Sequence, residues 1–136
     1  MRLNSFSFSG TAQQTVLNDF DGLSLTASCV TGANNGLTVN AFSGVPNAEI
    51  SYNGISKSGG APNGKATNDS VAISGTPTTI LSPGGNVDTG NTSIGLGFTV
   101  GQIVYSNSAG NVVTVDYRFN ASGATCQFDG TAVGRP

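Results

Sequence analysis

The sequence predicts an all-β fold: a single-domain antiparallel β-sandwich or jelly roll with eight to ten short strands and one long-range disulfide. Three observations lead to this prediction. The two stretches that carry the only two cysteines alternate between apolar and polar residues, which is the period of a half-buried strand. Turn-forming residues recur about every 8–12 positions. No segment combines the length and the capping residues of a helix.

The composition agrees with this fold class. Of the 136 residues, only 9% are charged and 37% are hydrophobic, while Ser, Thr, Asn and 20 Gly take the place of charge. Those residue types weaken helices and favour strands and turns. The length fits one domain over residues 1–136. Because the apolar residues are periodic rather than scattered, the alternative of a disordered chain is disfavoured.

Charge and hydropathy exclude several partners. The net charge is −2 and the charges are spread singly, so no basic stripe is available for nucleic acid. No apolar run approaches the ~20 residues of a membrane span. Met1 leads into an alternating polar stretch without the apolar core of a signal peptide. We therefore expect no nucleic acid and no membrane span, and we expect Met1 to be a start placed on a mature domain or a fragment.

The two cysteine-bearing stretches are the expected centre of the core. Leu23–Val30 has an apolar residue at every second position up to Cys29, and Val112–Val133 alternates in the same way through Cys126. If both cysteines point inward, they can meet across the core. Two cysteines in a chain with almost no Lys or Glu are typical of an extracellular or cell-surface protein, which favours a disulfide. Two buried free thiols in a cytosolic protein are the alternative, and zinc is disfavoured because the chain has no His.

Three further strands are expected in the first third of the chain. Leu3–Ser9 alternates between apolar and polar residues. Thr15–Leu17 is a short strand before Asn18–Gly22, a turn rich in Asn, Asp and Gly. Leu37–Phe42 is the strand that returns from a hairpin loop at Gly32–Gly36, since Asn and Gly tolerate positive φ.

The middle of the chain contains short strands and a long loop. Ala48–Tyr52 alternates with its apolar residues inward. The pattern fades over Asn53–Asn68, which Gly and Pro interrupt, so we expect a long exposed loop there. Ser70–Ser74 and Thr79–Leu81 are expected short strands, separated by a Gly-Thr-Pro turn.

The last third returns to longer strands. Pro83–Asn91 reads as a second loop. Ile94–Tyr105 is an apolar strand interrupted by glycines, which indicate bulges or a close backbone neighbour. Val112–Asn120 and Cys126–Val133 form the final pair.

The residues that catalysis would need are scarce. Histidine is absent, so the many serines lack their usual base. Glu49 and Asp116 sit on solvent-facing strand positions and could face each other, but outward carboxylates mostly solubilise a sheet. A Ser–Lys pair from Ser56, Lys57 and Lys65 would lie in the expected Gly-rich loop, where solvated lysines are the simpler interpretation. We therefore expect no enzyme activity and no cofactor.

Two turns contain candidate calcium ligands. Asp19 and Asp21, with their neighbours Asn18 and Gly22, resemble half of a calcium loop and offer hard oxygen ligands. Asn86–Asn91 is a weaker candidate. The remaining spacing of a calcium loop is missing, so an Asx-turn without metal is the preferred interpretation and we expect no metal site.

A glycan-binding module is the alternative function. Such modules share this fold class and usually present aromatic platforms, but the chain has no Trp and its tyrosines, Tyr52, Tyr105 and Tyr117, fall at inward or strand-end positions. Polar loops could still bind a sugar through Asn and Asp, with calcium assisting. Asn68, Asn91 and Asn120 begin N-x-S/T sequons, which arise by chance in so polar a chain.

Five blocks of the sequence form strand cores at both ends of the chain: Asp21–Cys29, Leu37–Val39, Gly101–Tyr105, Val112–Tyr117 and Thr125–Ala132. These blocks resemble a secreted, uncharacterised β domain of actinobacterial surface proteins. The resemblance skips roughly residues 52–92. The resemblance implies an exported bacterial domain with a Cys29–Cys126 bridge, and it transfers no activity because the blocks contain no catalytic motif. Some such proteins carry low-complexity stalks, which is compatible with a head domain.

These observations together predict a non-enzymatic extracellular or cell-surface structural or interaction domain, a self-assembling building block or a head domain. Low charge leaves little repulsion between copies, so we expect a homo-oligomer or a filament. The only lysines are Lys57 and Lys65, so charge guards few strand edges. The terminal strand Leu3–Ser9 is free to pair with a neighbour, although closing its own sandwich is the preferred alternative.

Overall fold

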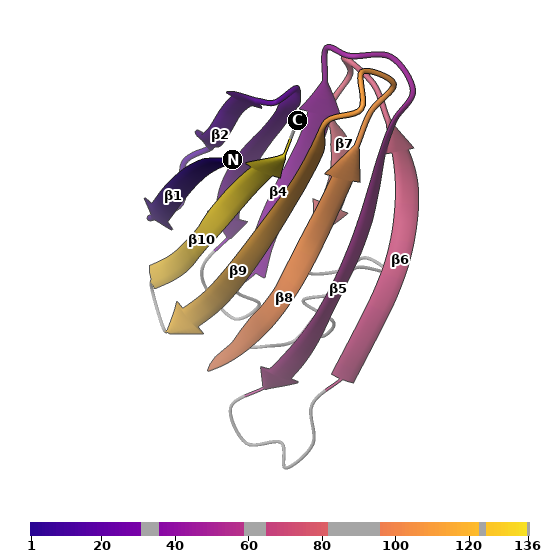
Figure 1. Ribbon diagram of the computed structural model, residues 1–136. Helices are drawn as coiled ribbons and strands as arrows, with labels where there is room; N and C mark the ends of the chain where they lie inside the picture. The colour runs from indigo at the N-terminus through magenta and orange to yellow at the C-terminus, as the bar shows by residue number, and fades with distance from the viewer. Residues whose placement is uncertain (31–35, 59–64, 82–95, 123–124, 136) are drawn as a thin grey trace.

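The structure, a computed structural model, describes residues 1–30, 36–58, 65–81, 96–122 and 125–135. These residues form two antiparallel sheets stacked as a β-sandwich, and they contain no helix (Figure 1). The strands are β1 (Arg2–Ser9), β2 (Gln14–Phe20), β3 (Leu23–Val30), β4 (Gly36–Ser43), β5 (Ala48–Ser58), β6 (Lys65–Ile73), β7 (Thr78–Leu81), β8 (Leu96–Ser106), β9 (Val112–Ser122) and β10 (Thr125–Arg135). The predicted all-β sandwich is confirmed.

The larger sheet has six strands in the order β1-β10-β9-β8-β5-β6, and the smaller sheet has four in the order β2-β3-β4-β7. Three hairpin-connected strands, β8 to β10, form the middle of the large sheet (Figure 1). The chain enters this sheet through β1, which pairs with β10 from Arg2 opposite Gly134 to Ser9 opposite Gln127. This pairing brings the two ends of the chain together.

The core lies between the two sheets, and alternation along each strand determines which side chains enter it. On β9, for example, Val113, Val115, Tyr117 and Phe119 are buried, whereas Asp116 and Arg118 between them are exposed. The largest fully buried side chains are Tyr105, Phe8, Phe119, Phe128, Leu17, Leu23, Leu25, Leu37, Ile50, Ile80 and Ile103. Full burial of one such side chain is worth roughly 1.5–3 kcal/mol, so this core is the main source of stability.

The prediction of a long loop over Asn53–Asn68 is wrong for most of that range. β5 continues to Ser58 and β6 begins at Lys65, so only residues 59–64 lie outside the described hairpin. The alternation fades there for a physical reason. Gly54 lies opposite Gly101 of β8, and the Gly101 position must stay free of a side chain because the Asn53 carbonyl oxygen and the Tyr117 hydroxyl lie against it. Glycines that accommodate a close neighbour remove the apolar period on which the prediction depended.

Smaller corrections concern element ends. The expected turn at Asn18–Gly22 is partly strand, since β2 runs to Phe20 with two register shifts in its pairing to β3. Those bulges break the alternation and hid the strand from the sequence pattern. Residues 32–35 of the hairpin loop and the second loop at 83–91 lie outside the described residues.

Candidate functional site

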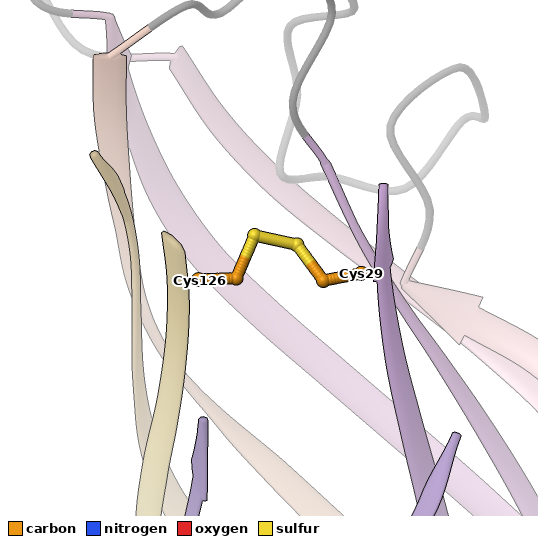
Figure 2. The surroundings of a disulfide bond; sticks show 2 residues. All are labelled: Cys29 and Cys126. Carbon is orange, nitrogen blue, oxygen red and sulfur yellow. A yellow bond between two sulfur atoms is a disulfide. The ribbon is translucent and has the colours of Figure 1, made fainter. Parts of the chain in front are cut away.

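The two cysteines form the disulfide that the sequence predicted. Cys29 on β3 and Cys126 on β10 face each other across the two sheets, with their Cα atoms 6.3 Å apart (Figure 2). That separation is within the usual range for a disulfide. Both residues are buried, with exposed fractions of 6% and 0%. The bridge therefore lies inside the core and joins one strand of each layer.

The connection between β1 and β2 is attached to the backbone of the same two cysteines. The Gly10 N–H donates to the Cys126 carbonyl at 3.3 Å, and the Cys29 N–H donates to the Thr11 carbonyl at 3.1 Å. The chain thus crosses from one sheet to the other beside the disulfide. This arrangement fixes the carboxyl end of β1 at its place in the large sheet.

The side of the six-stranded sheet that faces away from the four-stranded sheet is called the outer face from here on (Figure 1). Its residues are those that alternate with the buried ones on the same strands. Cross-strand rows run over it, and in one of them Leu3, Val133, Thr114 and Val104 lie opposite one another on β1, β10, β9 and β8. Leu3 is 67% exposed and the other three are half-buried.

The neighbouring rows of the outer face are polar and bonded to one another. The Ser7 hydroxyl donates to the Asp129 carboxylate at 2.7 Å, and Arg118 pairs with the same carboxylate at 3.4 Å. The Gln102 amide donates to Asp116 at 3.0 Å in the adjacent row. A shallow depression of about 420 Å³ lies between these rows, lined by Ser5, Phe6, Asp116, Tyr117, Arg118, Asp129, Gly130 and Thr131. Its hydroxyl, carboxylate and guanidinium groups could bind a polyhydroxy ligand by hydrogen bonding.

Sequence reasoning found that Asp116 faces solvent, but it did not find the depression. Ser5, Arg118, Asp129 and Thr131 meet only because β1, β10 and β9 are adjacent in a particular register. Period-2 alternation identifies them as outward-facing residues and gives no information about their neighbours.

The carboxylate pair considered for catalysis is not assembled. Glu49 lies opposite Ser106 of β8, whereas Asp116 lies opposite Gln102 on the other side of the same strand. The two acidic residues are thus separated both along β8 and by its width. Ser56 lies opposite Lys65 in the backbone register of the β5–β6 hairpin, but the side chains of both are outside the described part of the structure.

The tyrosines lie in the core, as the sequence pattern indicated. Tyr52, Tyr105 and Tyr117 are each at most 5% exposed. The Tyr105 hydroxyl is 2.7 Å from the Ser43 hydroxyl and accepts from the Asn107 amide at 2.9 Å. The rings of the three tyrosines therefore stabilise the sandwich from within and present no surface platform for a sugar.

Asp21, a calcium candidate, is already bonded to the amino-terminal strand. Its carboxylate accepts a hydrogen bond from Arg2 at 2.5 Å, and the Arg2 guanidinium lies 4.7 Å from the centre of the Phe20 ring. Asp19 and Asp21 both have positive φ, 48° and 50°, which is typical of Asp in a tight turn. Among the described residues, no three acidic, Cys or His side chains are grouped to hold a metal ion. The second candidate, Asn86–Asn91, lies outside those residues.

We predict that calcium is dispensable for stability. Because the carboxylate of Asp21 is engaged by Arg2, removing calcium should leave the melting temperature unchanged. Thermal melts with a chelator and with added calcium provide the measurement. A melting temperature many degrees lower in chelator would contradict the prediction, since a ligand bound tightly to the native state raises its stability by mass action.

Asn120, the first residue of one N-x-S/T sequon, is exposed near the end of β9.

In the part of the chain that the structure describes, there is no helix with the length and apolar character needed to cross a membrane.

Comparison of the chain with protein-family models, curated proteins and solved structures finds no match in any of the three. The resemblance to an actinobacterial surface domain therefore stays an expectation from the sequence.

Proposed function

We propose that this protein is a non-enzymatic extracellular or cell-surface structural domain that associates with other copies of itself. The buried Cys29–Cys126 bridge supports the compartment, because disulfides form and persist in oxidising environments. A sandwich cross-linked between its layers is suited to a building block exposed outside the cell. The same bridge agrees with the exported domain that the sequence blocks resemble.

The outer face supports the proposal of self-association. Its row of Leu3, Val133, Thr114 and Val104 places three aliphatic side chains and one threonine in line across four strands, with Leu3 well exposed. Two ion pairs, Arg2–Asp21 and Arg118–Asp129, compensate four of the few charges of the chain. Little net charge remains to repel a second copy.

Light scattering of the full-length protein over a range of concentrations tests the proposal. We expect a mass above the 13.6 kDa of one chain, rising with concentration. Because apolar contacts and backbone hydrogen bonds are screened little by salt, the association should persist at high ionic strength. A mass of one chain at every concentration would overturn self-association.

Glycan binding is the second candidate, and the depression on the outer face is the observation that favours it. Its polar lining could bind sugar hydroxyl groups, although Tyr117, which is among the lining residues, is only 5% exposed and offers no ring surface as a platform. A glycan array probed with and without calcium separates the two candidates. If the isosteric variant Asp129→Asn lost that binding, the second candidate would be supported, since this carboxylate lines the depression and pairs with Arg118.

A further inference from the structure

Among the described strands, four form the edges of the two sheets, and three of these carry features that hinder pairing with another chain. β2 has two register shifts and a positive φ at Asp19. β7 has only four residues and follows Pro77. β6 contains the charged residues Lys65 and Asp69. Bulges, short length, proline and charge are the devices by which natural sheets avoid edge-to-edge association.

The fourth edge, β1, has no bulge and no proline, and it is longer than β7. Its eight residues keep an unbroken register with β10 and include no lysine, proline or bulge. Its single charge, Arg2, stands at the end of the strand and is engaged by Asp21 and the Phe20 ring of the same chain. β1 is therefore a regular edge strand, and no other described strand pairs with its free side.

The backbone groups that β1 presents follow from one hydrogen bond. The Gly10 N–H donates to the Cys126 carbonyl, and this pair continues the register in which Phe8 lies opposite Phe128. In antiparallel pairs, residues that bond the neighbouring strand alternate with residues whose N–H and C=O point the other way. The even-numbered residues of β1 thus bond β10, and the odd-numbered ones face the open edge.

One contact supports this assignment independently. The Ser9 carbonyl accepts from the Gln14 side chain at 3.4 Å, on the side away from β10. Ser9 is thereby partly satisfied within its own chain. Leu3, Ser5 and Ser7 remain as the residues that present backbone donors and acceptors at the edge.

We propose that β1 pairs antiparallel with β1 of a second copy, about a two-fold axis at Ser5. This inference rests on the proposed self-association and assigns its contact to the β1 edge, so that the outer faces of the two copies adjoin. Ser5 then lies opposite its own symmetry mate, and Leu3 lies opposite Ser7 of the second copy. A two-fold contact uses the same surface on both molecules, so a strand that opposes no like charges to itself is suited to it. The two large sheets become one continuous sheet across the dimer.

The variant Ser5→Pro tests the pairing directly. Proline removes the backbone N–H of residue 5, which points to the open edge at the axis. Because this N–H makes no bond to β10, the fold should tolerate the substitution, as edge strands tolerate proline. Ser5→Ala is the matched control, because both variants lose the hydroxyl that lies 3.4 Å from the Thr131 hydroxyl and only one loses the N–H. In light scattering we expect Ser5→Pro to have the mass of one chain and Ser5→Ala to keep the wild-type mass.

A second variant keeps the inference testable if Ser5→Pro does not fold. Ser5→Lys retains the backbone N–H but places two lysines opposite each other at the axis, so its association should be weakened at low salt and recover at high salt. A wild-type protein with the mass of one chain would overturn both the proposed function and this inference. If the wild type is an oligomer and a correctly folded Ser5→Pro or Ser5→Lys variant forms the same oligomer, the β1 contact alone is overturned.

Discussion

Replacing both cysteines, in Cys29→Ala/Cys126→Ala, is expected to lower the free energy of unfolding by about 4–5 kcal/mol. The residues are 97 positions apart, so the bridge closes a long loop and restricts the unfolded chain strongly. Because domains of this kind are stable by only about 5–15 kcal/mol, the loss would leave the variant marginal. Urea unfolding of the wild type and the variant, with the midpoint and slope compared, provides the measurement.

Two controls separate the cross-link from the side chains. Wild-type protein reduced in denaturant and refolded with reductant keeps both sulfur atoms, so it should lose nearly as much stability as the double variant. If only the alanine variant is destabilised, the effect comes from the lost packing of two buried side chains. Mass spectrometry completes the test: the unreduced protein should take up no alkyl groups under denaturing conditions, and uptake of two would disprove the bridge.

The sequence identified most strands because most of them have one buried face. On β4, β9 and β10 buried residues alternate with more exposed ones, since one side of each strand packs into the core. β3 alternates in residue type although Ser24 and Thr26 on its other face are buried too, and on β1 only Phe8 is fully buried. The same alternation placed both cysteines inward and so anticipated their bridge. Prediction from alternation missed the end of β2 and the half of the β5–β6 hairpin beyond Tyr52, because bulges and glycines interrupt the period there.

The candidate surface could be predicted only in part. Alternation showed that Glu49 and Asp116 face outward, yet it suggested that they could meet, whereas the register sets them apart. The depression and the open β1 edge both depend on strand order, with β1 next to β10 although they lie at opposite ends of the chain. Strand order comes from long-range pairing, and no local sequence period encodes it.

A single methyl group at Gly101 is expected to destabilise the protein by about 3 kcal/mol or more, at or above the upper end of typical overpacking effects. A Cβ at this position would collide with the Asn53 carbonyl oxygen of β5 and would lie 2.6 Å from the Tyr117 hydroxyl. The backbone of β5 is held by pairing on both sides, so it has little room to move. Urea unfolding of Gly101→Ala provides the measurement.

Gly44→Ala is the matched control, because a Cβ there meets nothing within 4 Å. It should change stability by less than about 0.5 kcal/mol, as most surface substitutions do. Combining Gly101→Ala with Tyr117→Phe then identifies the group responsible. The Tyr117 hydroxyl donates to the same Asn53 carbonyl at 3.4 Å, so its removal should restore part of the stability if the hydroxyl is the main obstacle and none if the carbonyl is. A Gly101→Ala protein as stable as Gly44→Ala would show that β5 and β8 are not packed as closely at this crossing as the structure places them.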